Sequence, residues 1–170
     1  ADGLINDRRN QNLWIYTADC MPILIADKRR RSVAAIHCGR RGLENKIIKN
    51  VIKIFHEKGS VKDDLIVAIG PSISKKNYLV DNETLQDFYN QTAYKDTLTS
   101  SEDKKILLSF KGENFISIDL KKFAYMQLLN ENVPNSNIDI SNLCTYESNH
   151  EFYSWRKSKT SSRQWNFISS

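Results

Sequence analysis

Three short apolar runs, separated by polar turns, open the chain and constrain its fold most strongly. Residues 13–17, 23–27 and 32–37 are rich in β-branched and aromatic side chains, which favours strands. Only the basic segment 28–31 separates the last two runs, so a hairpin is predicted there. A helical pattern begins at Gly42, so strands and a helix must pack against each other.

The rest of the chain alternates between helical and extended patterns. Apolar residues recur at helical spacing from Gly42 to Gly59, over 82–91 and over 119–132. The apolar run 65–69 predicts a central strand that is buried on both faces. The remaining segments are predicted as strands at 115–118, 138–140 and 143–146, and as a loop or insertion at 92–113.

No repeat, linker or break in composition divides the 170 residues, and this length suits one domain. Because strands and helices mix along the chain, the predicted class is α+β (mixed α/β), with mixed β-sheets packed against flanking helices. We therefore expect a single domain over residues 1–170.

The net charge of +5 and the pI of about 9.1 raise the question of an anionic partner. Much of the charge falls in 28–31, at a turn, and aromatic residues do not alternate with basic ones as they do on RNA-binding strands. The charge therefore indicates a solvated surface, with no nucleic-acid partner. No membrane partner is expected, since no apolar run is long enough to cross a bilayer.

The three cysteines, Cys20, Cys38 and Cys144, are odd in number and widely spaced. This pattern is not that of a disulfide framework, and it contains no CxxC pair. A reducing, cytoplasmic setting is the simpler expectation.

Two strand ends carry the side chains best suited to chemistry. Asp19 and Cys20 follow the first predicted strand, and His37 ends the third. A thiolate and an imidazole suit zinc or copper, and the same two groups could form a Cys–His nucleophile pair. Each could equally be structural, as a buried thiol or a hydrogen-bonded imidazole. His56, near a helix end, and His150, in a polar loop, are weaker candidates.

A glycine-bounded turn follows His37. Gly39 and Gly42 bracket Arg40 and Arg41, and the predicted helix starts there. Exposed backbone N–H groups at such a turn suit an anion such as phosphate.

Several motifs along the chain occur in one order, and that order resembles the laccase-domain family, also called multicopper polyphenol oxidase or YfiH-like proteins. The resemblance spans nearly the whole chain. The motifs are Ala1-Asp2-Gly3, Asp19-Cys20-Met21-Pro22, His37-Cys38-Gly39-Arg40-Arg41-Gly42, Gly70-Pro71-Ser72-Ile73 with Tyr78-Leu79-Val80, Cys144-Thr145, Phe152-Tyr153-Ser154-Trp155-Arg156 and Ser162-Arg163-Gln164.

The resemblance implies a YfiH-like fold and a zinc-dependent purine nucleoside phosphorylase that also deaminates adenosine. Adenosine, inosine, guanosine or methylthioadenosine would be the nucleoside, and phosphate the second substrate. The family's metal is held by one Cys and two His, with copper proposed in place of zinc. Cys20 and His37 match two of these ligands. The other His precedes the Ala-Asp-Gly motif, so we expect an N-terminally truncated domain that lacks it.

Further roles also follow from the resemblance. Asp19 would orient a metal ligand or move a proton, although a strand-end hydrogen bond explains it equally well. Arg41 is the first candidate for phosphate or ribose contact, and Arg156 and Arg163 are weaker ones. Two positions depart from the family pattern: Arg40 stands where Trp is usual, and Ser162 where Gly is usual.

Three alternatives share these residues. The first is a copper-dependent polyphenol oxidase, which three histidines are too few to support as a multicopper cluster. The second is a thiol hydrolase with Cys20 as nucleophile and His37 as base. The third is a non-catalytic remnant. The sequence does not specify an oligomeric state.

Overall fold

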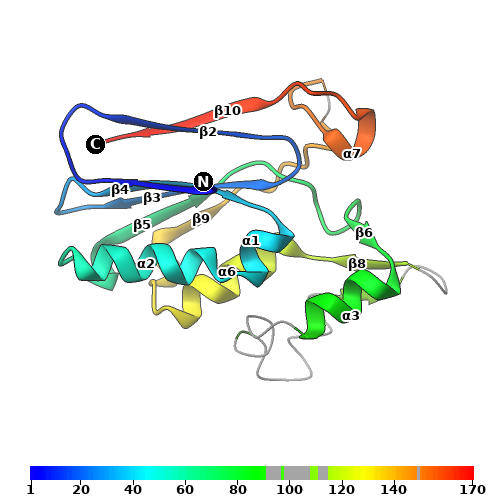
Figure 1. Cartoon of the computed structure of the whole chain (residues 1–170), viewed down its shortest axis with the longest axis horizontal. Coiled ribbons are helices and arrows are strands. Elements are labelled where there is room, and N and C mark those ends of the chain that lie inside the picture. Colours follow the sequence, from blue (N-terminus) through cyan, green and yellow to red (C-terminus); the bar gives the residue numbers. More distant parts are fainter. Residues whose placement is uncertain (91–96, 98–107, 111–114, 149) are drawn as a thin grey trace.

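The computed structural model describes residues 1–90, 97, 108–110, 115–148 and 150–170. Its main body has three layers (Figure 1): a two-stranded sheet, a five-stranded sheet, and helices on the far side of the larger sheet. A three-stranded sheet lies beside these layers. The predicted α+β class, with mixed sheets and flanking helices, is confirmed.

The five-stranded sheet has the order β1–β4–β3–β5–β9. Neighbouring strands are antiparallel except for β5 and β9. The hairpin predicted around 28–31 is β3–β4, in which Pro22 pairs with His37 and Met21 with Cys38. This register brings Cys20, just before β3, and His37, near the end of β4, to the same end of this strand pair. The strands are β1 (Gly3–Asn6), β3 (Met21–Asp27), β4 (Val33–Cys38), β5 (Leu65–Ile69) and β9 (Ile138–Ile140).

The second sheet pairs β2 (Asn12–Thr17) with β10 (Gln164–Ser169), which the sequence pattern did not predict as a strand. Side chains alternate between its two faces. The inner face contacts β4, and the outer face exposes four aromatic rings. They interact across the pair, with the rings of Trp14 and Phe167 stacked at 4.6 Å. The four are Trp14, Tyr16, Trp165 and Phe167.

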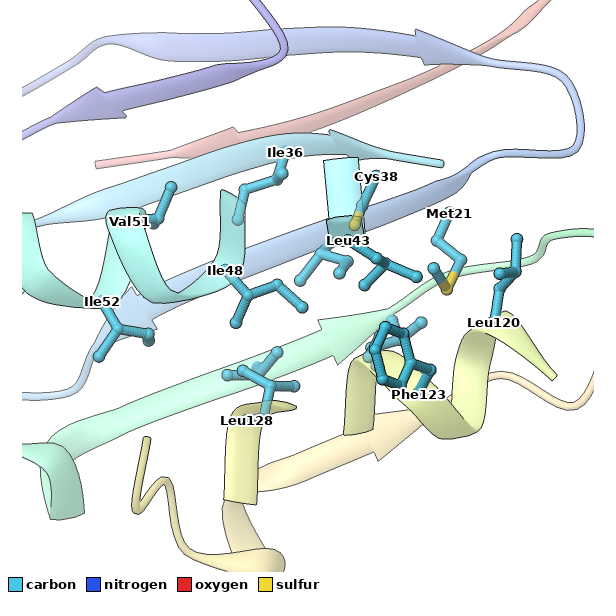
Figure 2. Close-up of a cluster of buried hydrophobic side chains, with 14 of the residues drawn as sticks. Met21, Ile36, Cys38, Leu43, Ile48, Val51, Ile52, Leu120, Phe123 and Leu128 are labelled. Atoms are coloured by element: carbon cyan, nitrogen blue, oxygen red, sulfur yellow. The ribbon is translucent and has the colours of Figure 1, made fainter. Parts of the chain in front are cut away.

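Helices α1 (Arg40–Glu44), α2 (Ile47–Glu57) and α6 (Leu120–Asn130) cover the other face of the main sheet. Lys46 has a left-handed backbone (φ 55°), so the helix predicted from Gly42 is two helices. The Asp119 side chain caps α6 by accepting the Lys122 N–H at 2.9 Å. The buried helix faces and strands form one core (Figure 2) that includes Met21, Ile36, Cys38, Leu43, Ile52, Phe123 and Leu128.

The three-stranded sheet has the order β6 (Leu79–Val80), β8 (Ile116–Ile118) and β7 (Leu108–Phe110). Helix α3 (Asn82–Asn90) confirms the prediction at 82–91, and Asp81 caps it by accepting the Thr84 N–H at 2.8 Å. The other helical elements among the described residues are the four-residue helix α7 (Trp155–Ser158) and the 3-10 turns Lys62–Asp64 and Asn135–Asn137.

Two predictions about strands are wrong. β5 is not buried on both faces: its residues alternate, and Ile66 is 43% exposed, because the β2–β10 layer contacts β4 and leaves this part of the sheet uncovered. Residues 143–146 form no strand and make a single bridge between Cys144 and Ser72. Most of the loop predicted at 92–113 falls outside the described residues. Among the described helices, none is long and apolar enough to span a membrane.

Candidate active site

Cys20 and His37 lie together where β3 begins and β4 ends. Cys20 directly precedes β3, and its thiol packs against the turn after β4: a Cβ placed on Gly39 would come within 2.6 Å of Cys20 Sγ. His37 is partly exposed, whereas the next side chain, Cys38, points into the core. The period-2 alternation of β4 therefore assigns the imidazole to the cleft and the neighbouring thiol to packing.

Two cavities meet at this point. The first, of about 380 Å³, is lined by Tyr16, Asp19, Trp155, Arg156 and Arg163, among others. The second, of about 370 Å³, is lined by Asp2, Gly39, Arg40, Arg41 and Gly42. Three residues line both cavities, namely Cys20, His37 and Tyr78.

Asp19 is buried and holds three segments together. Its carboxylate accepts the Thr145 hydroxyl at 2.8 Å and the Arg156 backbone N–H at 2.7 Å. Its carbonyl accepts the N–H of Ile73 at 2.9 Å. Its φ of +91° is in the left-handed region that non-glycine residues rarely occupy. Such a conformation persists at functional sites where surrounding contacts enforce it, and here those contacts fix the backbone next to Cys20.

Asp2 is a site residue that the strand pattern did not single out. Its Oδ1 lies 3.6 Å from His37 Nδ1, and its carbonyl accepts the His37 N–H at 2.8 Å. A carboxylate near one ring nitrogen favours the orientation in which the other nitrogen is free to bind a metal. The available signal was the position of Asp2 in the Ala1-Asp2-Gly3 motif.

Burial raises the pKa of the Cys20 thiol to about 11, and the charge of Asp19 adds to the effect. The thiol is therefore protonated at neutral pH unless a cation displaces its proton. A catalytic cysteine needs the opposite shift, and no hydrogen bond joins Cys20 to His37 in the described residues. Both observations disfavour the thiol-hydrolase alternative, whereas a bound metal deprotonates a coordinating thiol outright.

The arginines are divided between the cavities. Arg41 is exposed at the second cavity. Arg156 lies at the first, where its Nη1 donates to the Leu79 carbonyl at 2.8 Å. Arg163 also lies there, and its charge opposes the increase in the pKa of Cys20. Its Nη1 donates to the carbonyls of Thr160 and Ser162.

The other sequence candidates lie away from this cleft. His56 Nδ1 lies 2.9 Å from the Ser60 carbonyl, at the end of α2, and His150 is exposed near Glu151. Cys144 is buried against Ser74. All three cysteines are free thiols.

As a donor set, Cys20 and His37 fit two of the ligands that zinc prefers. Within the described part of the chain, no third His, Cys, Asp or Glu joins them in a metal-binding group. The described residues therefore offer two of the ligands that a zinc site would need.

Alanine at Gly39 is expected to displace the Cys20 thiol, because its Cβ would overlap Sγ. We expect zinc affinity to fall by roughly 10- to 100-fold, the range for residues that position metal ligands. Competition with a chelating dye measures the change. Gly3→Ala is the control, since a Cβ there makes ordinary contacts of 3.6 Å or more. Unchanged affinity in Gly39→Ala would show that the thiol is not a ligand.

The fold and the cleft together define a class of protein: an α+β domain that holds a thiol beside an imidazole at a cleft. Over residues 1–170 it matches the family described as multi-copper polyphenol oxidoreductase laccase, and it belongs to that family. The resemblance inferred from the sequence motifs is thereby confirmed.

Several relatives carry the name purine nucleoside phosphorylase. One from Synechocystis sp. is 32% identical over 99% of this chain and 67% of its own length. One from Clostridium acetobutylicum is 33% identical, with 99% and 66% covered, and one from Bacteroides thetaiotaomicron is 31% identical, with 92% and 56% covered. The structure of YlmD from Geobacillus stearothermophilus aligns with a TM-score of 0.88 at 29% identity, covering 99% of this chain and 60% of YlmD. The chain thus spans 56% to 67% of the length of these relatives.

Proposed function

We propose that this chain supplies the catalytic cleft of a zinc-dependent purine nucleoside phosphorylase. The substrates are inosine, adenosine, guanosine or methylthioadenosine together with phosphate. The observation that carries the proposal is that Cys20 and His37 lie together where two cavities meet, each lined by two arginines. The names of the relatives support the same class of reaction.

Each group has a role in this proposal. Cys20 and His37 hold the metal, and Asp2 orients His37. When bound, zinc acts as a Lewis acid and lowers the pKa of a coordinated water. Asp19 keeps the backbone at Cys20 and the start of α7 in place, because both of its carboxylate oxygens are already engaged. Trp155, which lines the first cavity, offers an aromatic surface to the purine.

Deamination of adenosine is the second activity proposed for the same cleft, through attack of water on C6. The purine would lie beside the metal in both phosphorolysis and deamination, so the same residues around Cys20 would serve both reactions. Copper in place of zinc is the remaining alternative for the metal. A multicopper cluster finds little support, since His56 and His150 lie away from His37 and each has other neighbours.

The test is to supply inosine with and without phosphate to the complete gene product. We expect hypoxanthine and ribose 1-phosphate only when phosphate is present, and we expect a chelator to stop the reaction until zinc is restored. Hypoxanthine release without phosphate would indicate a hydrolase instead. Oxidation of phenols by the copper-loaded protein, with no phosphorolysis by the zinc-loaded protein, would favour the oxidase.

A further inference from the structure

The outer face of the β2–β10 sheet consists of the rings of Trp14, Tyr16, Trp165 and Phe167. Figure 1 shows this pair of strands as an outermost layer, with the five-stranded sheet on one side and no described element on the other. The four side chains are between 48% and 64% exposed. Large apolar side chains that gather in one exposed patch mark a surface that contacts another element, whereas scattered ones do not.

The patch carries no charge, which limits what can bind to it. Neither β2 nor β10 contains a Lys, Arg, Asp or Glu, although such residues make up 26% of the chain. A surface that binds a polynucleotide needs cations for the phosphates, so nucleic acid is not the expected occupant. Aromatic residues without charges are typical of the buried centre of a contact between protein surfaces.

A second uncovered apolar surface adjoins the first at the edge of β10. A groove of about 560 Å³ lies between this strand and the main sheet, and its lining includes Leu24, Ile66, Ala68 and Ile168. Among the described strands, β10 pairs only with β2, so the backbone groups of its other edge are open to a further strand. A strand added at that edge would lie over the groove and cover Ile66, which is 43% exposed.

The relatives indicate what covers these two surfaces. YlmD contains this scaffold within a longer chain, and the relatives named purine nucleoside phosphorylase are also longer than the part that matches. Additional residues of such a chain gain most by packing where apolar surface is still in contact with water. We infer that residues of the complete gene product outside this chain cover the β2–β10 sheet, with a strand along the β10 edge and an apolar layer over the four rings.

A second copy of the chain is the competing occupant, and the size of the patch disfavours it. Four half-exposed aromatic side chains offer roughly 400 Å² of surface, whereas each partner in a stable complex contributes about 800 Å². A segment of the same chain needs less surface, because it does not lose the translational and rotational freedom that two separate molecules lose on association.

Hydroxyl-radical footprinting of the complete gene product measures whether the face is covered. The oxidation rates of Trp14 and Trp165 are read by mass spectrometry and divided by the rates of the same side chains in the urea-unfolded protein. We expect both ratios to lie roughly fivefold or more below those of half-exposed side chains, since the centre of a protein contact is packed like a protein interior. Ratios that match the 48% and 64% exposure of these side chains in the described structure would overturn the inference.

Phe167→Glu and Val61→Glu form a matched pair for the same protein. The two side chains are similarly exposed, at 53% and 56%, but Val61 directly precedes the turn Lys62–Asp64, away from the β2–β10 sheet. If the face is covered, a carboxylate at position 167 is placed in an apolar contact, so the Tm should fall by roughly 5 °C or more. Val61→Glu should leave the Tm unchanged. Equal Tm values in the two variants would contradict a covered face, and the footprint of the unmodified protein applies whether or not Phe167→Glu folds.

Light scattering on the same samples identifies the occupant. Protection of Trp14 and Trp165 in a monomer, or in a dimer that Phe167→Glu leaves intact, supports a segment of the same chain. A dimer that Phe167→Glu converts to monomers with exposed Trp14 and Trp165 would show that a second copy covers the face, and would overturn the inference.

Discussion

Alanine in place of Cys20 is expected to remove zinc from the protein and to lower phosphorolysis of inosine about a thousandfold. The sulfur supplies one of two paired donors at the cleft, and the described residues offer no substitute. Lewis-acid stabilisation contributes several kcal/mol, and each factor of ten in rate corresponds to about 1.4 kcal/mol. His37→Ala should produce the same loss through the nitrogen donor. Zinc content after desalting and initial rates of hypoxanthine release measure both effects.

Cys38→Ala is the matched control for these variants. Its thiol is one residue from His37 but points into the core, where it is fully buried. We expect this variant to retain zinc and activity and to lose about 1 kcal/mol of stability, as expected when a small buried group is deleted. If Cys20→Ala retained full activity, or Cys38→Ala lost zinc as completely, the assignment of Cys20 would be wrong.

Alanine at Asp19 is expected to have the largest effect on stability among the site variants. The substitution leaves the Thr145 hydroxyl and the Arg156 N–H without their acceptor in a buried setting. Each lost partner costs about 1–3 kcal/mol, so the free energy of unfolding is expected to fall by about 2–6 kcal/mol in total. Urea titration measures the loss. Activity should fall with it, because the backbone at Cys20 depends on these contacts.

Asparagine at position 19 separates the two roles considered for this residue. Its amide oxygen can accept the Arg156 N–H while its NH₂ donates to the Thr145 hydroxyl, which can rotate to accept. Asparagine also tolerates the left-handed backbone better than alanine does. If Asp19 only positions its neighbours, Asp19→Asn should keep most of the stability and activity. A stable Asp19→Asn protein that is as inactive as Asp19→Ala would instead show that the carboxylate moves a proton.

The cleft's main pair could be predicted because its position depends on local pattern. The strands around Cys20 and His37 are rich in β-branched residues and joined by a short turn, so their pairing followed from neighbouring sequence. The helices 82–91 and 119–132 were predictable for a similar reason, since each has periodic apolar residues and an aspartate cap.

The remaining site residues depend on contacts between distant segments, which local patterns do not encode. Asp2 reaches His37 because the four-residue strand β1 pairs with β4. Trp155 and Arg156 reach the cleft because Asp19 binds a backbone N–H that is 137 residues away in sequence. Tyr78 lies in a turn between strands, where no periodicity marks it. The alternation in β5 was missed because an apolar run does not reveal how far the β2–β10 layer extends.

Zinc K-edge X-ray absorption on the zinc-loaded complete gene product tests the central claim most directly. The spectrum should show one sulfur at about 2.3 Å and nitrogen or oxygen neighbours at about 2.0–2.1 Å, which are the distances of thiolate and imidazole ligands. The sulfur shell should disappear in Cys20→Ala and persist in Cys38→Ala. A shell of nitrogen and oxygen alone in the unmodified protein, or a sulfur shell that survives in Cys20→Ala, would contradict a metal site built on Cys20 and His37.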